Sequence, residues 1–358
     1  MIYVFVLIYC SLYFYAIQKN KVNFFILIPP FLIYFLIPAL QYDIGSDYFS
    51  YIYIYENQWV LDRYFNSGEY FFYYANKFLG YMNAPSQSIF IVFSFFQSLF
   101  IFIYFLVLKK RGATLWFLFL LFFTVTGVYH NQLNGIRQYA ALTLLPLLTI
   151  YLFERKFISY FLGCAIATMF HSSSMVFFLL PLFLLVDRVV SERYIFVFFL
   201  LSFPVYLLIG KYTHILLETF NLRYVSYIDS EYFVRGNYIN VITKIYYIPA
   251  LVLFYIVYPD NRINHIGFLN DKYFKFVVLI FSFTYWSFLM SLDIAILSRL
   301  ASYFWFFIIF PLYYLACYIK KSNYFLFLIY IMYIILPYLA KVTFLAKNEY
   351  LYRSYIFN

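Results

Sequence analysis

Long apolar runs recur from one end of this chain to the other, and they constrain its fold more than any other feature. Most are long enough to cross the roughly 30 Å hydrocarbon layer of a bilayer as a helix. Of the 358 residues, 66% are hydrophobic and only 11% are charged, which is too little charge to cover the surface of a soluble domain. We therefore predict an all-α polytopic membrane protein with about 12 transmembrane helices.

The distribution of charge predicts how these spans are oriented. With the N-terminus outside, the inward loops carry 14 of the 25 basic residues and 5 of the 15 acidic ones, giving +9 inside against +1 outside. This is the positive-inside rule, and it predicts an even number of spans with both chain ends outside. The net charge of +10 therefore does not indicate a nucleic-acid partner. The expected spans are residues 2–18, 23–41, 89–108, 114–129, 138–153, 157–170, 172–186, 194–209, 243–258, 274–292, 300–319 and 324–340.

The first apolar run and residues 157–186 do not fit the simple pattern of one full-length span. The first apolar run has no basic region before it and no small-residue cleavage site, so we expect a retained span and not a signal peptide. Residues 157–186 are long for one helix and short for two. We expect two short spans that meet at His171, because a single span would invert every later loop and remove the charge bias.

Two segments expected on the outer face, residues 41–88 and 210–243, are too long to be plain connectors. In the first, Asp47 is predicted to N-cap a helix over Tyr48–Tyr55, and residues 69–79 form an amphipathic helix on the outer surface. We see no repeat of fixed period, linker or low-complexity region, so a single domain covering the whole chain is expected.

The stretch Thr126–Ala141 places polar residues inside an apolar run. A charge near lipid costs at least about 2.5 kcal/mol for a central arginine, so it usually marks a site or a helix end. If helix resumes near Asn134, the cation of Arg137 lies in the first turn, where the helix dipole does not favour it. A buried anion nearby would explain that placement, because Arg137 and the helix end would bind it together. The alternative is a wet loop whose arginine reaches the surface.

Each remaining polar candidate also has a structural interpretation. His171 lies between two apolar halves, where a histidine is often only a satisfied polar cap. Asp47 follows Gly45 and is equally interpreted as part of a turn. Arg235 lies in the most charged external segment, which is equally interpreted as a solvated loop. Arg299 has Asp293 six residues before it, so an ion pair is the alternative to a ligand role.

The sequence contains no P-loop, dinucleotide fingerprint, GxSxG turn or His/Cys cluster of metal-binding spacing. Its three cysteines, Cys10, Cys164 and Cys317, lie in apolar segments without paired spacing, so neither a disulfide nor a zinc site is predicted. Accordingly we expect no cofactor and no metal.

Cations, a carboxylate and a histidine at the outer leaflet suit a lipid-linked phosphate as substrate. Transfer from a polyprenyl diphosphate needs a cation for the departing diphosphate and a base for the acceptor hydroxyl. We expect Arg137 and Arg299 to bind the diphosphate. The base is expected to be His171, whose unperturbed pKa is about 6.5, with Asp47 orienting the acceptor, although the reverse assignment is open. Further binding candidates are Arg235, Gln138 and His130.

The segments DIGSDYFSYIYIY, GIRQYAALTLL, FHSSSMVFFLLP and SRLASYF, in this order and spacing, resemble the EpsG/Wzy-type polysaccharide polymerases. The resemblance runs from about Ile37 to Tyr303. The family pattern often has an arginine shortly before its Gly-x-Asp, where this chain has Gln41-Tyr42-Asp43, so no cation is carried over there. The family is grouped loosely with GT-C-like glycosyltransferases, which implies an all-helical fold by analogy. The most specific parts are Gly45-x-Asp47-Tyr48, Ile136-Arg137-Gln138 and Phe170-His171-x-Ser173.

The resemblance implies a multi-pass enzyme of the bacterial inner membrane that extends O-antigen, capsule or exopolysaccharide chains. The growing glycan on undecaprenyl diphosphate would be transferred to a new lipid-linked repeat unit. The implied partners are the lipid-linked oligosaccharide, membrane lipid and a chain-length regulator. Two alternatives stay open. A lipid-linked oligosaccharide flippase would hold cations deep in a central cavity and need no base, and a membrane acyltransferase would also depend on histidine.

Overall fold

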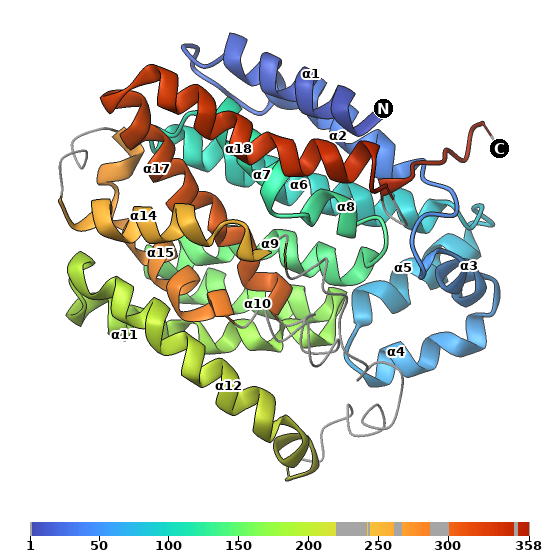
Figure 1. The fold of residues 1–358 in the computed structure, drawn as a ribbon. Coiled ribbons are helices and arrows are strands. Elements are labelled where there is room, and N and C mark those ends of the chain that lie inside the picture. The colour runs from blue at the N-terminus through green and yellow to red at the C-terminus, as the bar shows by residue number, and fades with distance from the viewer. Residues whose placement is uncertain are drawn as a thin grey trace. The chain divides into compact units, whose positions relative to one another are not determined.

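The computed structural model describes residues 2–219, 242, 244–260, 267–286, 301–346 and 350–357. All regular structure in these residues is helical apart from one isolated bridge between Gln41 and Ser354, so the all-α prediction is confirmed (Figure 1). Among the described residues, five helices are long and apolar enough to cross a membrane, and the count of 12 spans stays a prediction. The five are Ser88–Lys110, Ile136–Phe153, Ser172–Val189, Ala301–Ser322 and Tyr324–Thr343.

The chain divides into two compact units. Unit 1 comprises Met1–Leu179 and Leu328–Asn358, and unit 2 comprises Leu180–Phe327. The helices of unit 1 are α1 (Ile2–Ala16), α2 (Ile28–Ala39), α3 (Tyr48–Glu56), α4 (Asp62–Asn66), α5 (Tyr70–Tyr81), α6 (Ser88–Lys110), α7 (Leu115–Val125), α8 (Val128–Asn131), α9 (Ile136–Phe153), α10 (Phe157–Phe170) and most of α18 (Tyr324–Thr343), with the 3-10 segments η1 (Phe25–Leu27), η2 (Gln58–Leu61) and η3 (Ser172–Leu179).

Helix α9 lies at the centre of unit 1. Both α6 and α10 pack along it, and nearly all of its residues are buried. At its C-terminal end, Glu154 pairs with Arg111 (Nη2–Oε1 2.6 Å) and with Lys156 (Nζ–Oε2 2.8 Å). With 18 residues, α9 is about 27 Å long, close to the hydrocarbon thickness of a bilayer. The polar stretch that precedes α9 and this basic cluster therefore lie at opposite ends of one span.

The helix ends just before His171, as the sequence predicts. Helix α10 ends at Phe170, and His171 has extended backbone angles (φ −155°, ψ 124°). The following segment, η3, folds back along α10, where the Tyr160 hydroxyl donates to the carbonyl of Phe177 and Phe161 stacks on Phe178 with 6.0 Å between ring centroids. Residues 157–179 therefore form a hairpin and not one continuous helix.

Both helices predicted in the first outer segment are present. Helix α3 spans Tyr48–Glu56 with Asp47 at its N-cap position, as predicted. The side chain of Asp47, however, makes no capping hydrogen bond. Helix α5 spans Tyr70–Tyr81 and is amphipathic, with Phe72 buried and Phe78 exposed.

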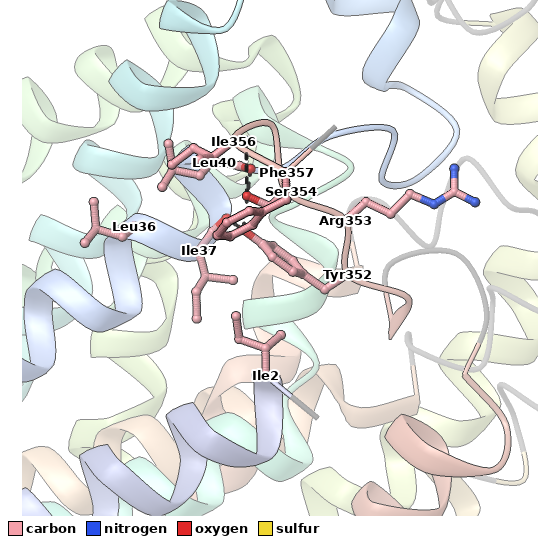
Figure 2. Close-up of a pocket in the computed structure, with 9 residues that line it drawn as sticks. All are labelled: Ile2, Leu36, Ile37, Leu40, Tyr352, Arg353, Ser354, Ile356 and Phe357. Carbon is pink, nitrogen blue, oxygen red and sulfur yellow. Dashed lines mark hydrogen bonds between the residues drawn. The ribbon is translucent and has the colours of Figure 1, made fainter.

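The C-terminal tail of unit 1 packs beside the end of α2 (Figure 2). The Tyr352 hydroxyl donates to the carbonyls of Ile37 (3.1 Å) and Leu40 (3.4 Å). A largely apolar cavity of about 540 Å³ opens there, lined by side chains of α1, α2 and the tail. Arg353 also lines this cavity, and its side chain extends away from the other labelled side chains (Figure 2).

Unit 2 is built mainly from apolar helices. Its long helix α12 packs against α15, and α14 packs against α17. Lys275 of α15 bonds both the Asp187 carboxylate (3.2 Å) and the Asp187 backbone carbonyl (2.7 Å), which joins α15 to the last turn of α11. The elements of unit 2 are α11 (Pro181–Val189), η4 (Glu192–Tyr194), α12 (Ile195–Thr219), α14 (Ile248–Val257), η7 (Tyr258–Asp260), η8 (Gly267–Asn270), α15 (Lys272–Thr284), η10 (Phe306–Ile308), α17 (Ile309–Ser322) and the start of α18.

Candidate functional site

The candidate site begins with Arg137, in the first turn of α9 just after the N-cap residue Gly135. Its guanidinium Nη1 donates to Oε2 of Glu69 in an ion pair. The Glu69 side chain is 5% exposed and that of Arg137 is 17% exposed, so the pair is largely withdrawn from water. The buried anion that the position of Arg137 leads us to expect is therefore present, and it is a carboxylate of the protein.

Aromatic rings surround the guanidinium of Arg137. Its Cζ lies 4.5 Å from the ring centroid of Tyr64, 4.9 Å from that of Phe72 and 5.7 Å from that of Tyr51. Rings at these distances attract a cation and also exclude water from it. Glu69 does not use every donor of this guanidinium. The buried Nε of Arg137 has no hydrogen-bond partner within the part of the chain that the structure describes.

The carboxylate of Glu69 also holds the turn that follows α10. Its Oε1 accepts from both the backbone N–H and the hydroxyl of Ser172, each at 3.2 Å. Burial alone would raise the pKa of Glu69, but Arg137, His171 and the Ser172 N–H together hold this pKa below its ordinary value. Glu69 is therefore ionised at neutral pH, and both of its oxygens are engaged.

His171 lies at this turn, half-buried, beside the carboxylate of Glu69. The Ser173 backbone N–H donates to Nδ1 of His171 at 3.3 Å, and the Ser173 hydroxyl lies 2.7 Å from the same nitrogen. A hydroxyl both donates and accepts, so it is compatible with either tautomer of the imidazole. The backbone bond favours the neutral tautomer with its proton on Nε2, whereas the tautomer in which Nδ1–H donates to the hydroxyl gives up that bond and leaves Nε2 as a base.

The turn Gly45–Asp47 packs directly on the polar stretch before α9. The backbone N–H of Asp47 donates to Oδ1 of Asn134 at 2.9 Å, and the Ser46 hydroxyl donates to Asp47 Oδ1 at 3.0 Å. Gly45 has φ +75°, and a Cβ there would lie 2.4 Å from Asn134 Oδ1. Only glycine fits this position without displacing Asn134. The carboxylate of Asp47 stays partly exposed.

Unit 1 thus brings together the three most specific segments of the sequence pattern. Asn134 and Arg137 come from the polar stretch, Asp47 from the first outer segment and His171 from the turn after α10. Near the start of the first outer segment, Asp43 forms an ion pair with Arg353 of the C-terminal tail. The chain therefore places a cation beside Gln41-Tyr42-Asp43 from its far end, which the local sequence cannot reveal.

The other predicted binding residues are His130, Gln138, Arg235 and Arg299. His130 is fully buried among aromatic rings, stacked on Tyr350 (4.3 Å between centroids) and within 3.2 Å of the Tyr338 hydroxyl, so we leave it out of the proposed site. Gln138 is buried in the first turn of α9. Arg235 and Arg299 lie outside the described residues.

Glu69 is the residue that the sequence analysis misses. It appears there only as the first residue of an amphipathic helix, and its partners are 68 and 103 positions away in the chain. The sequence offers only an indirect signal: Glu69 is followed by five aromatic residues, where a carboxylate needs a partner. Across the described residues, no group of three or more His, Cys, Asp or Glu side chains is placed to hold a metal ion.

The fold and this cluster define a helical membrane protein with a buried ionic site at one end of a central span. Comparison with protein families finds the EpsG family over residues 24–357, nearly the whole chain. The chain therefore belongs to the EpsG family, and it is a membrane protein of polysaccharide biosynthesis. Comparison with curated proteins and with solved structures finds no match.

Proposed function

We propose that the chain is a glycosyltransferase that polymerises lipid-linked oligosaccharide repeat units at the outer face of the bacterial inner membrane. The observation that carries this proposal is the cluster of Arg137, Glu69 and His171 with Asp47 on the adjoining turn. An ionic cluster of this kind inside an apolar chain usually marks a substrate site. Its cation, base candidate and carboxylate match what transfer from a lipid-linked diphosphate requires.

The proposed reaction moves the growing glycan from its diphosphate carrier to a new unit. The acceptor hydroxyl oxygen attacks the anomeric carbon, and the bond from that carbon to the phosphate oxygen breaks. The bonding electrons leave with undecaprenyl diphosphate, whose charge Arg137 and the N-terminus of α9 stabilise. The hydroxyl proton goes to the base. The donor at Nε of Arg137 that Glu69 leaves unused supports this role.

His171 is the proposed base and Asp47 the proposed ligand of the acceptor hydroxyls. Ser173 fixes the imidazole at Nδ1, and Glu69 stabilises the imidazolium that forms as the proton arrives. Glu69 is a positioning residue in this scheme, because both of its oxygens are already engaged by Arg137 and Ser172. One arginine balances only part of a diphosphate, so we propose Arg299 and Arg235 as further cations.

The experiment that tests this function replaces Arg137 with Lys, which keeps the charge but loses the planar fork that binds two phosphate oxygens. We expect Arg137→Lys to insert normally and to leave single-repeat glycan on the lipid carrier at the outer face. A flippase defect would instead keep these units inside. Polymer of wild-type length at a normal protein level would rule out the assigned role.

A second substitution tests the base. His171→Gln keeps a hydrogen-bonding side chain but cannot take up a proton, so we expect polymerisation to slow by about 10²–10⁴-fold. The rate of dimer formation from purified lipid-linked repeat units measures this. The matched control is Ser172→Ala, which removes one hydrogen bond to Glu69 and leaves the imidazole in place. If His171→Gln works at the normal rate, the histidine is only a cap, and Asp47 becomes the base.

A further inference from the structure

A second, polar pocket lies at the opposite end of α5 from Glu69. It has a volume of about 570 Å³ and is formed by the end of α3, the start of η2, the last turn of α5 and the loop after it. Its lining carries a carboxylate, an ammonium group, two amides and two phenol rings, contributed by Glu56, Lys77, Gln58, Asn83, Tyr55 and Tyr81. Nothing in the proposed reaction uses these groups.

The inner wall of this pocket is held rigidly. The Tyr55 hydroxyl donates to the carbonyl of Ala84 at 2.5 Å, and Gln58 Nε2 donates to the carbonyl of Tyr55 at 2.7 Å. Gly80 lets the Gln58 amide lie across α5, since a Cβ there would be 3.2 Å from Gln58 Nε2. These contacts fix the wall and leave Gln58 Oε1 as an acceptor.

The outer rim, in contrast, presents groups that are not used by the protein. Tyr81 is 83% exposed, and the side chains of Glu56 and Asn83 make no hydrogen bond or ion pair with any residue that the structure describes. Asn83 has φ +52°, which holds its amide at the end of α5. An exposed ring beside fixed amide and carboxylate groups suits a sugar, because the ring stacks on C–H groups while the amide and the carboxylate bond paired hydroxyls.

The distance between this pocket and Glu69 fits a chain of sugars. Helix α5 has 12 residues and is about 18 Å long, with Glu69 at its N-cap and the pocket at its last turn. A few linked sugar rings cover that length. A glycan held here would therefore reach the ionic cluster only if it were longer than one sugar.

We propose that this pocket is a glycan-binding subsite that holds the repeat unit a few sugars away from the bond being formed. The inference rests on the proposed function, and it assigns an uncharged or weakly charged oligosaccharide as the ligand. By holding the product after each addition, the subsite keeps the growing chain on the enzyme, so it acts on chain length and not on the chemical step.

The test uses the full-length protein in nanodiscs and oligosaccharides of one to three repeat units released from the host's own surface polysaccharide. The variant Tyr81→Ala/Asn83→Gly removes the exposed ring and the rim amide, and glycine accepts the positive φ of residue 83. We expect this variant to raise the Kd at least tenfold and, in cells, to shorten the polymer while the first addition continues. The matched control is Phe78→Ala, since Phe78 is 63% exposed on the same helix and does not line the pocket.

An unchanged Kd in the pocket variant would overturn the inference, as would an equal loss in Phe78→Ala, which would indicate that the outer face of α5 binds membrane. Binding that follows the anionic lipid content of the nanodisc and not the added oligosaccharide would also overturn it. Arg137→Lys separates the two proposals. If Arg137→Lys makes normal polymer, the assigned reaction site is wrong, but the glycan-binding subsite is not affected by that result. If only Arg137→Lys loses oligosaccharide binding, the subsite is wrong, but the reaction site is not.

Discussion

Two arginine–carboxylate pairs tie the first outer segment to the rest of unit 1, and they differ mainly in exposure. In the pair of Arg137 with Glu69, the side chains are 17% and 5% exposed, and aromatic rings cover the guanidinium. In the pair of Arg353 with Asp43, they are 60% and 33% exposed. A guanidinium and a carboxylate thus form one pair that is shielded from water and one that is exposed to it.

Exposure to water decides how much each pair contributes to stability. A surface pair gains little, because water already solvates both charges and the side chains lose freedom when they associate. In a buried pair each charge depends on the other, so that removing one leaves an uncompensated charge behind. Such a pair is a costly way to hold two helices together. Its presence is better explained by a task for Arg137, with Glu69 keeping the cation in position.

The largest effect on stability is expected from breaking the buried pair. Glu69→Gln leaves the cation of Arg137 without its counter-charge, so the free energy of unfolding should fall by on the order of 3 kcal/mol. Thermal unfolding in nanodiscs at pH 7 measures this. Glu154→Gln is a matched control, because it breaks a more exposed pair at the other end of α9. Equal losses in the two variants would contradict the contrast drawn here.

The pH dependence of this effect has a definite sign. The folded-state pKa of Glu69 lies below its ordinary value of 4.5, so the stabilisation is present above pH 4.5 and is lost as the pH falls through the lowered pKa. The stability difference between wild type and Glu69→Gln should therefore be constant near neutral pH and shrink in acid. A difference that grows on acidification would show that the carboxylate is not held ionised.

A smaller effect on stability is expected at Gly45, which lies between Asp43 and Glu69 in the sequence. Gly45→Ala places a Cβ 2.4 Å from Asn134 Oδ1 at φ +75°, so we expect a loss of about 1–2 kcal/mol and reduced polymer. Gly68→Ala is the matched control, because Gly68 has φ +80° and nothing within 4 Å of an added Cβ. Comparing the unfolding midpoints of the two variants separates contact with Asn134 from backbone strain. Equal midpoints would mean that the contact is unimportant.

The smallest effect is expected from the exposed pair. Asp43→Asn should change the free energy of unfolding by less than about 1 kcal/mol, because the side chains of both partners are at least one third exposed. The tail also stays attached through backbone bonds, since Tyr42 N–H donates to the Arg353 carbonyl at 3.0 Å. Thermal unfolding at low and high salt measures this. A loss of unfolding free energy as large as that in Glu69→Gln would show that exposure does not decide what the two pairs contribute.

Most of the local structure could be predicted from the sequence. The apolar runs predict helices, Asp47 marks the start of α3, and the break at His171 follows from length and charge bias. These features depend on neighbours in the chain. The anion beside Arg137 could also be anticipated, because a cation in the first turn of a buried helix requires one.

The identity of that anion could not be predicted, since Glu69 reaches Arg137 and Ser172 only after distant helices pack. His130 depends on distant packing in the same way. The polar stretch predicts it as a ligand, and in the structure it packs among tyrosines from both chain ends, including Tyr3 and Tyr350. Pairing over such separations is set by tertiary packing, which no local pattern in one sequence encodes.

We propose that Arg137, held by Glu69, serves the substrate and not only the fold. The most direct measurement compares stability and polymerisation in the double variant Glu69→Gln/Arg137→Met, which removes both buried charges. We predict that its free energy of unfolding returns to within about 1 kcal/mol of the wild-type value, because no unpaired charge is left. Single-repeat glycan should still accumulate on the lipid carrier. A double variant that is stable and also makes polymer of normal length at a normal rate would show that Arg137 serves only the fold.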